Sequence, residues 1–154
     1  MIWKGVYLIF NKLGMGGTFD HLHEGHKYLI KIALDLSKQV TIGLTMETLH
    51  QNKKFSSKIE DFKTRKAHIE EYISSIADPN RVEIVPLNDP YGPPINEPNY
   101  EAIIVSEESY NGALKINQMR IKKGFNPLII IVIPMIKDSH HHIISSTAIR
   151  ATLK

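Results

Sequence analysis

Short runs of β-branched residues alternate along the chain with longer segments whose apolar residues recur every three or four positions. The runs have the length of buried strands, and the longer segments have the period of helices that bury one face. This alternation is typical of a parallel sheet with helices on both faces. Strands are predicted at residues 6–15, 40–45, 82–87, 102–105 and 128–133. The pattern therefore predicts a doubly wound, Rossmann-like α/β fold, with ligands at the carboxyl ends of five parallel strands.

Four helices are predicted between and after these strands. Residues 25–36 carry one apolar stripe, and a second helix is expected from Ser57 to about residue 78, because Ser57 and Glu60 have capping-box spacing. A third helix is expected from the cap Ser106 to Gly124, and a last one from Ser146 or Thr147.

Composition limits the class of protein. A chain of 154 residues that is 42% hydrophobic can fill one core, so residues 1–154 are predicted to be a single domain. The absence of cysteine excludes a disulfide scaffold and a thiolate site, and it fits a cytoplasmic location. The net charge is only +3 and the basic residues are dispersed, which disfavours nucleic acid as a partner. The most apolar stretch, residues 127–136, is too short to span a membrane.

A concentration of glycine and histidine follows the first predicted strand. Gly16 and Gly17 end that strand, where the lack of side chains lets backbone approach a phosphate closely. His23 and His26 stand at the start of the next helix, where unpaired N–H groups and the helix dipole favour an anion. This segment is therefore a candidate phosphate site.

The same segment resembles a motif of the HxGH nucleotidyltransferase superfamily, carried here by His23-Glu24-Gly25-His26 after Gly-Gly-Thr-Phe-Asp. A second segment, residues 144–150, resembles that superfamily's ISSTxIR motif. The two motifs stand about 120 residues apart on an alternating chain, which makes their joint occurrence strong evidence. Residues 89–93, 105–108, 116–120 and 124–128 further resemble the archaeal and eukaryotic phosphopantetheine adenylyltransferase family.

The resemblance implies transfer of AMP from ATP to 4′-phosphopantetheine, giving dephospho-coenzyme A and pyrophosphate, with Mg²⁺ arriving with ATP and no protein ligand assigned to it. It implies that His23 and His26 act on the transferring phosphoryl group, together with a lysine that is either Lys53 or Lys54; Lys54 is slightly preferred. The remaining substrate-binding residues that it implies are Gly17, Thr18, Phe19, Gly25, Asn117, Arg120, Ser145, Ser146, Thr147 and Arg150. Among them, the resemblance implies that Arg120 binds the triphosphate of ATP, and that the segment from Ser145 to Arg150 lies at its β- and γ-phosphates.

Other interpretations stay open at this point. Another adenylyl- or cytidylyltransferase, such as a nicotinamide-mononucleotide adenylyltransferase, would share both phosphate motifs. A nucleotide-sensing module would keep the glycines but has no need of both His23 and His26. His140, His141 and His142 are interpreted as an exposed loop, because three adjacent histidines do not readily face one ion. The sequence does not determine the oligomeric state.

Overall fold

The computed structural model describes residues 8–50, 55–135 and 144–153. Its centre is a five-stranded sheet in which every pairing is parallel and the strand order is β3-β2-β1-β4-β5. The strands are β1 (Phe10–Gly17), β2 (Ser37–Thr45), β3 (Val82–Leu87), β4 (Ala102–Ser106) and β5 (Ile129–Ile133). The order is that of a doubly wound sheet, so the predicted fold class is confirmed.

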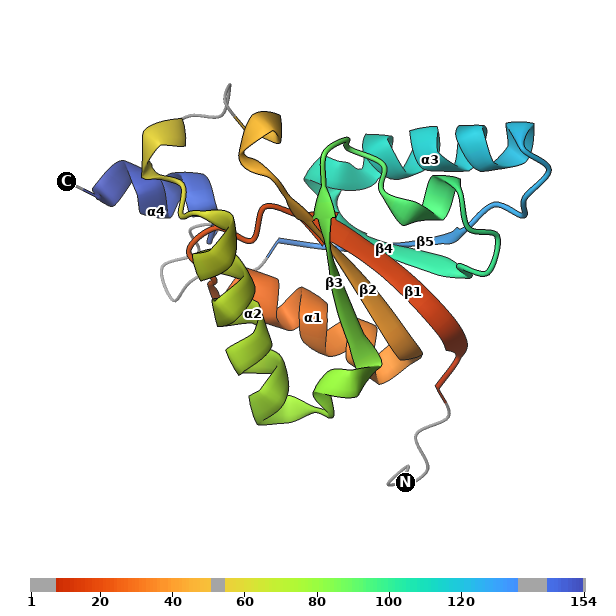
Figure 1. The fold of residues 1–154 in the computed structure, drawn as a ribbon, viewed down its shortest axis with the longest axis horizontal. Helices are drawn as coiled ribbons and strands as arrows, with labels where there is room; N and C mark the ends of the chain where they lie inside the picture. Colours follow the sequence, from red (N-terminus) through yellow and green to blue (C-terminus); the bar gives the residue numbers. More distant parts are fainter. Residues whose placement is uncertain (1–7, 51–54, 136–143, 154) are drawn as a thin grey trace.

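Four α-helices accompany the sheet: α1 (Glu24–Leu36), α2 (Phe62–Ile76), α3 (Tyr110–Lys122) and α4 (Ser146–Thr152). Figure 1 shows α1 and α2 on one face of the sheet and α3 on the other, with α4 beyond the carboxyl ends of the strands. No helix in the described part of the chain is long and apolar enough to cross a membrane.

Each face of the sheet buries its own cluster of apolar side chains. The larger cluster lies between the sheet and the helices α1 and α2, and includes Leu13, Ile30, Ile42 and Ile69. The smaller cluster lies under α3, and includes Tyr100, Ile103, Ala113, Ile116 and Leu128. These two clusters fix the strand ends on which the site is built.

The strand order reverses between β1 and β4, and the two strands separate there. β1 pairs with β2 from Phe10 to Gly17, but with β4 only at Leu13 and Gly14. The carboxyl ends of β1 and β4 therefore leave a crevice, which is where ligands bind in sheets of this kind.

Element boundaries differ from the prediction mainly around the second helix. α2 begins at Phe62, and Asp61 is its cap because the Asp61 carboxylate accepts the N–H of Thr64 at 2.7 Å. The capping box predicted at Ser57 is wrong: Ser56–Lys58 is a 3₁₀ turn, and the Glu60 carboxylate instead accepts the N–H of His21 at 2.8 Å. Long-range bonding thus overrides a local capping signal.

The other boundary differences are small. β1 begins at Phe10 and continues to Gly17, and residues 6 and 7 lie outside the described part of the chain. β2 follows α1 without a loop, starting at Ser37. Ser106 precedes a 3₁₀ turn, Glu107–Ser109, so α3 starts later than predicted, while Gly124 (φ +81°) lies just past its end as expected. The predicted start of α4 at Ser146 is confirmed.

Candidate active site

A cleft of about 620 Å³ lies at the carboxyl ends of the strands, and we call it the phosphate cleft. The end of β1, the start of α1 and the start of α4 form its walls, with Ser106 and Ile133 contributed by β4 and β5. Gly17, Thr18, Phe19, His23, Gly25 and His26 all line it. Ser145, Ser146, Thr147 and Arg150 line it as well. Two motifs far apart in sequence therefore face the same space.

The two motif histidines are fixed by the start of α1. His23 is the helix cap, and its Nδ1 accepts the N–H of Gly25 at 3.1 Å. His26 Nδ1 accepts the N–H of His23 at 3.3 Å, which completes a reciprocal capping arrangement. The rings stack with centroids 3.7 Å apart and planes inclined by 20°.

These bonds assign the protonation of both rings. A ring nitrogen that accepts an N–H carries no proton, so neutral His23 and His26 each carry the proton on Nε2. Burial lowers the pKa of His23, an effect that the Glu24 carboxylate opposes only partly. The neutral forms of His23 and His26 therefore hold two Nε2–H donors at the cleft.

Gly25 and Phe19 shape the space around the histidines. A Cβ at Gly25 would lie 2.9 Å from His23 Cε1, so any other residue there would displace the capping ring. Phe19 is buried with its ring centroid 5.3 Å from that of His26. It holds a left-handed backbone (φ +50°), which turns the chain from β1 toward α1.

The α4 side of the cleft presents hydroxyl groups in defined roles. Ser145 Oγ caps the helix by accepting the N–H of Ala148 at 3.1 Å. Ser146 Oγ donates to the Asp20 carbonyl at 2.6 Å and lies 3.5 Å from His26 Nε2. Thr147 Oγ1 accepts from Arg150 Nη2 at 3.2 Å. The hydroxyl hydrogens of Ser145 and Thr147 are therefore available in directions other than these bonds.

Arg150 lines the cleft but is committed to a carboxylate below it. Its Nη1 lies 2.8 Å from Asp20 Oδ2, and both side chains are almost completely buried. The sequence motif placed Arg150 on the triphosphate, whereas this guanidinium joins α4 to the β1–α1 loop.

A second cleft, of about 350 Å³, lies on the α3 side of the sheet and is called here the apolar cleft. Leu87, Tyr91, Tyr100, Ile103 and Val105 give it apolar walls. It shares Gly16, Gly17, Glu108 and Ser109 with the phosphate cleft, so the two spaces meet at the end of β1. Near this junction, Thr45 Oγ1 donates to Thr18 Oγ1 at 3.1 Å.

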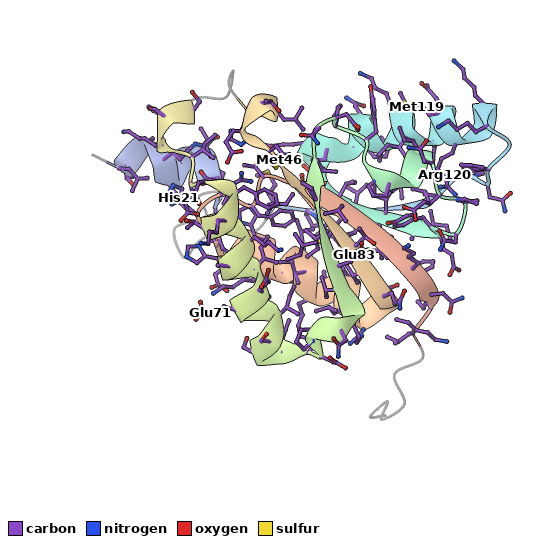
Figure 2. All side chains as sticks on the ribbon, viewed as in Figure 1. His21, Met46, Glu71, Glu83, Met119 and Arg120 are labelled. Carbon is purple, nitrogen blue, oxygen red and sulfur yellow. The ribbon has the colours of Figure 1, made fainter. Side chains whose placement is uncertain are left out.

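Two of the predicted substrate-binding residues, Asn117 and Arg120, lie outside both clefts. All five N–H groups of Arg120 donate to backbone carbonyls, namely those of Pro94, Glu97, Pro98, Tyr100 and Asn126. The Asn117 side chain makes two hydrogen bonds to the backbone of Leu128: its Nδ2 donates to the Leu128 carbonyl, and its Oδ1 accepts the Leu128 N–H. Arg120 is fully buried, and Figure 2 shows it on α3, on the opposite side of the molecule from His21. Neither residue lines the phosphate cleft or the apolar cleft, and their assignment as substrate-binding residues stays a prediction.

Some predicted residues lie outside the described part of the chain: Lys53, Lys54 and His140 to His142. Others were missed. Asp20 and Glu108 stand in segments that carry the family resemblance but received no role, and Thr45 and Ser109 carry no recognisable pattern. All four follow or end a strand at the carboxyl edge of the sheet, which a strand prediction could have identified.

The geometry is that of a phosphate-transfer site at the switch point of a doubly wound sheet, and the sequence comparison defines its class. Residues 15–152 match the cytidylyltransferase-like family, to which the chain belongs. Within it, the chain is similar to the phosphopantetheine adenylyltransferases: 41% identical over 141 residues to that of Methanopyrus kandleri, covering 92% of this chain and 89% of the relative.

Two further comparisons agree. The phosphopantetheine adenylyltransferase of Saccharomyces cerevisiae is 39% identical over 150 residues, covering 94% of this chain, which spans 49% of the yeast protein's length. A solved structure of a protein of unknown function from Archaeoglobus fulgidus superposes with a TM-score of 0.71 at 34% identity, covering 79% of this chain and 88% of that one.

Proposed function

We propose that the protein is a phosphopantetheine adenylyltransferase: it transfers the AMP moiety of ATP to 4′-phosphopantetheine, releasing pyrophosphate and forming dephospho-coenzyme A. The observation that carries the proposal is the stacked pair His23 and His26, whose Nε2–H groups are assigned by helix capping and lie at the phosphate cleft beside the start of α4. The family membership supports it.

The proposed reaction needs positioning and charge stabilisation more than covalent chemistry. A phosphate oxygen of the acceptor attacks the α-phosphorus of ATP, and the bond to the β-phosphate bridging oxygen breaks. His23 and His26 donate to the α-phosphoryl oxygens, where negative charge is spread in the transition state. The start of α4, with Ser145 and Thr147, holds the β- and γ-phosphates. No proton has to leave a protein group for the products to form.

The apolar cleft is the proposed site of the pantetheine arm. That arm is long, flexible and amide-bearing, so it needs an elongated apolar groove with a few polar partners. Tyr91 contributes one wall, from a segment held by Arg120, and a wall that is rigid before binding lowers the entropy cost of ordering the arm. Because the clefts meet at Gly17, the acceptor phosphate reaches the α-phosphate of ATP beside Thr18.

We propose that Mg²⁺ enters with ATP, held by phosphate oxygens and water. In the described part of the chain one group of three side chains, Asp20, His21 and Glu60, is close enough to face a single cation. Arg150 already neutralises Asp20, and the N–H groups of Glu60 and His21 occupy the carboxylates, so this group does not suit a metal ion. The role of the lysine stays a prediction for Lys54, with Lys53 as the alternative. We also expect a cytoplasmic enzyme.

A pyrophosphate-release assay with ATP and alternative acceptors tests the proposal. We expect kcat/KM for 4′-phosphopantetheine to exceed that for nicotinamide mononucleotide by at least ~100-fold, about 2.7 kcal/mol. Equal kcat/KM values for both acceptors would contradict the substrate assignment but not the transfer of AMP from ATP. ATP binding with no pyrophosphate release on any acceptor would favour a nucleotide-sensing module.

A further inference from the structure

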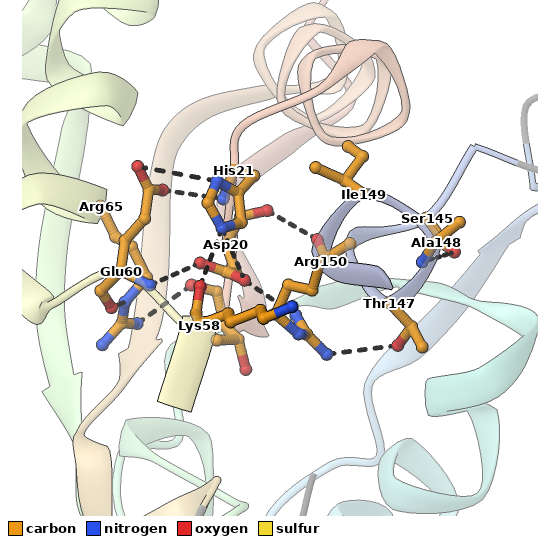
Figure 3. A network of polar contacts seen from close by, with 12 residues as sticks. Asp20, His21, Lys58, Glu60, Arg65, Ser145, Thr147, Ala148, Ile149 and Arg150 are labelled. Atoms are coloured by element: carbon orange, nitrogen blue, oxygen red, sulfur yellow. Dashed lines mark hydrogen bonds and ion pairs between the residues drawn. The ribbon is translucent and has the colours of Figure 1, made fainter. Parts of the chain in front are cut away.

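Asp20 connects three segments that are distant in sequence (Figure 3). Its Oδ1 accepts the N–H of Glu60 at 2.8 Å, and its Oδ2 accepts from Arg150 Nη1 at 2.8 Å. Its carbonyl oxygen accepts the hydroxyl of Ser146 at 2.6 Å. The β1–α1 loop, the turn before α2 and both ends of the α4 motif are therefore held by a single residue.

The ion pair between Asp20 and Arg150 is buried. The side chain of Asp20 is 0% exposed and that of Arg150 4%, so the ion pair is excluded from water. Removing one charge would leave the other buried without the partner of its ion pair, which is strongly unfavourable. The pair is therefore sensitive to any change that removes one charge.

The backbone on either side of Asp20 is also unusual. Phe19 (φ +50°) and His21 (φ +46°) both adopt the left-handed conformation, which side chains other than glycine rarely occupy. Such residues persist where surrounding contacts hold them, and they cluster at functional sites. The hydrogen bonds and the ion pair of Asp20 are contacts of this kind, and they stabilise the loop that leads into His23.

We propose that Asp20 and Arg150 form a positioning pair: their ion pair fixes the start of α4 against the His23–His26 stack, and Arg150 acts through Asp20, not on the triphosphate. A second contact joins the same parts of the site, because the Ser146 hydroxyl donates to the backbone carbonyl of Asp20 and lies 3.5 Å from His26 Nε2. Thr147, which receives the second guanidinium nitrogen of Arg150, is set by the same pair. This inference rests on the proposed function, in which α4 binds the β- and γ-phosphates.

The opposing assignment predicts a different result for Asp20. If Arg150 contacted the triphosphate, removing the Asp20 charge would release the guanidinium toward phosphate, and ATP would bind as well or better. If the two residues are a positioning pair, Asp20→Asn and Arg150→Gln disturb the same contact. Each substitution then weakens ATP binding, and the second adds nothing to the first.

A double-mutant cycle measured by calorimetric binding separates these cases. The proteins are the wild type, Asp20→Asn, Arg150→Gln and the double variant, each titrated with ATP and with AMP. We expect both single variants to lose about 10- to 100-fold in ATP affinity, the size of a lost charge-assisted hydrogen bond. The double variant should bind ATP no worse than the weaker single variant. AMP, which lacks the β- and γ-phosphates, should change by less than about threefold.

The proposal would be wrong if Arg150→Gln lost much more ATP affinity than Asp20→Asn. It would also be wrong if the losses in ATP affinity of the two single variants added up in the double variant. Equal losses for ATP and AMP would also overturn it, because they would indicate a general disturbance of the fold. Arg150→Lys is the control for loss of folding. It keeps the charge beside Asp20 and should retain most of the ATP affinity. These titrations contain no acceptor. If the wild type binds ATP but does not use 4′-phosphopantetheine, the proposed function is wrong, and the double-mutant cycle can still be interpreted.

Discussion

The two clefts on either side of Gly16 and Gly17 are built in opposite ways. The phosphate cleft is made by polar contacts between β1, α1 and α4, and its key groups are helix caps. The apolar cleft is made by side chains of the sheet and α3, and its outer wall is held from beneath by Arg120. In the proposed reaction, the phosphate cleft holds the charged groups that many acceptors could share, whereas the apolar cleft can distinguish acceptors. Chemistry and selectivity therefore depend on different contacts.

The largest effect is expected on the wall of the apolar cleft. Arg120→Met should lower the free energy of unfolding by about 3–5 kcal/mol, because buried carbonyls lose charged donors. Urea unfolding measures it, with Lys122→Met, an exposed residue of the same helix, as the control. The folded variant should retain the ATP affinity of the phosphate cleft. Specific loss of ATP binding at unchanged stability would instead support the triphosphate role that sequence predicted.

The next effect concerns the phosphate cleft. His26→Ala should lower kcat by about 10²- to 10³-fold with little change in ATP affinity, because its donor matters most in the transition state. Steady-state kinetics and ATP titration measure the two quantities separately. His68→Ala, on the partly exposed face of α2, should keep normal turnover. Near-normal kcat for His26→Ala would mean that this histidine does not serve the transfer.

A matched pair of glycines tests the two clefts on an equal footing. Gly25→Ala should lower kcat by roughly tenfold, since the new Cβ forces the His23 ring out of its capping position. Gly112→Ala adds the same methyl group to α3 at a position that lines the apolar cleft, where no atom lies within 4 Å. It should raise helix stability by about 0.5–1 kcal/mol and leave the ATP affinity of the phosphate cleft unchanged. An unchanged kcat for Gly25→Ala would contradict the tight packing of Gly25.

The smallest effect is a pH dependence of stability that arises from His23 in the phosphate cleft. The pKa of His23 is lowered by burial from 6.5, so the unfolded chain takes up this proton first as the pH falls. The folded state therefore loses stability from pH 6.5 downward toward the lowered pKa, and is unaffected above it. His23→Asn keeps a capping side chain but no titrating group, and should reduce this loss. Urea unfolding at about pH 7.5 and about pH 5.5 compares the two proteins.

The fold could be predicted from sequence because apolar residues have a different spacing in strands and in helices. Each element here is long enough for this spacing to be recognised. The phosphate cleft could be predicted in part, because Gly16, His23 and Ser145 stand in local motifs at strand and helix ends. Arg120 could not: a helical arginine one turn from Asn117 looks the same in sequence whether it faces a phosphate or five carbonyls. The Ser57 cap failed for a related reason, since the carboxylate of Glu60 found a distant partner at His21.

The contacts of Asp20 with Ser146 and Arg150 also bear on the order in which the molecule folds. They close chain segments of 126 and 130 residues, whereas β1–β2 and β2–β3 pair residues that are only 27 and 42 positions apart, as in Phe10–Ser37 and Val40–Val82. Closing a longer loop costs more chain entropy, and contacts far apart in sequence form late. The β1–β2–β3 layer with α1 and α2 can therefore assemble first, with the histidine pair already capped. Docking of α4 is then the step that converts a folded but incomplete scaffold into a working enzyme, so folding measured by helix signal and folding measured by regained activity should have different rates.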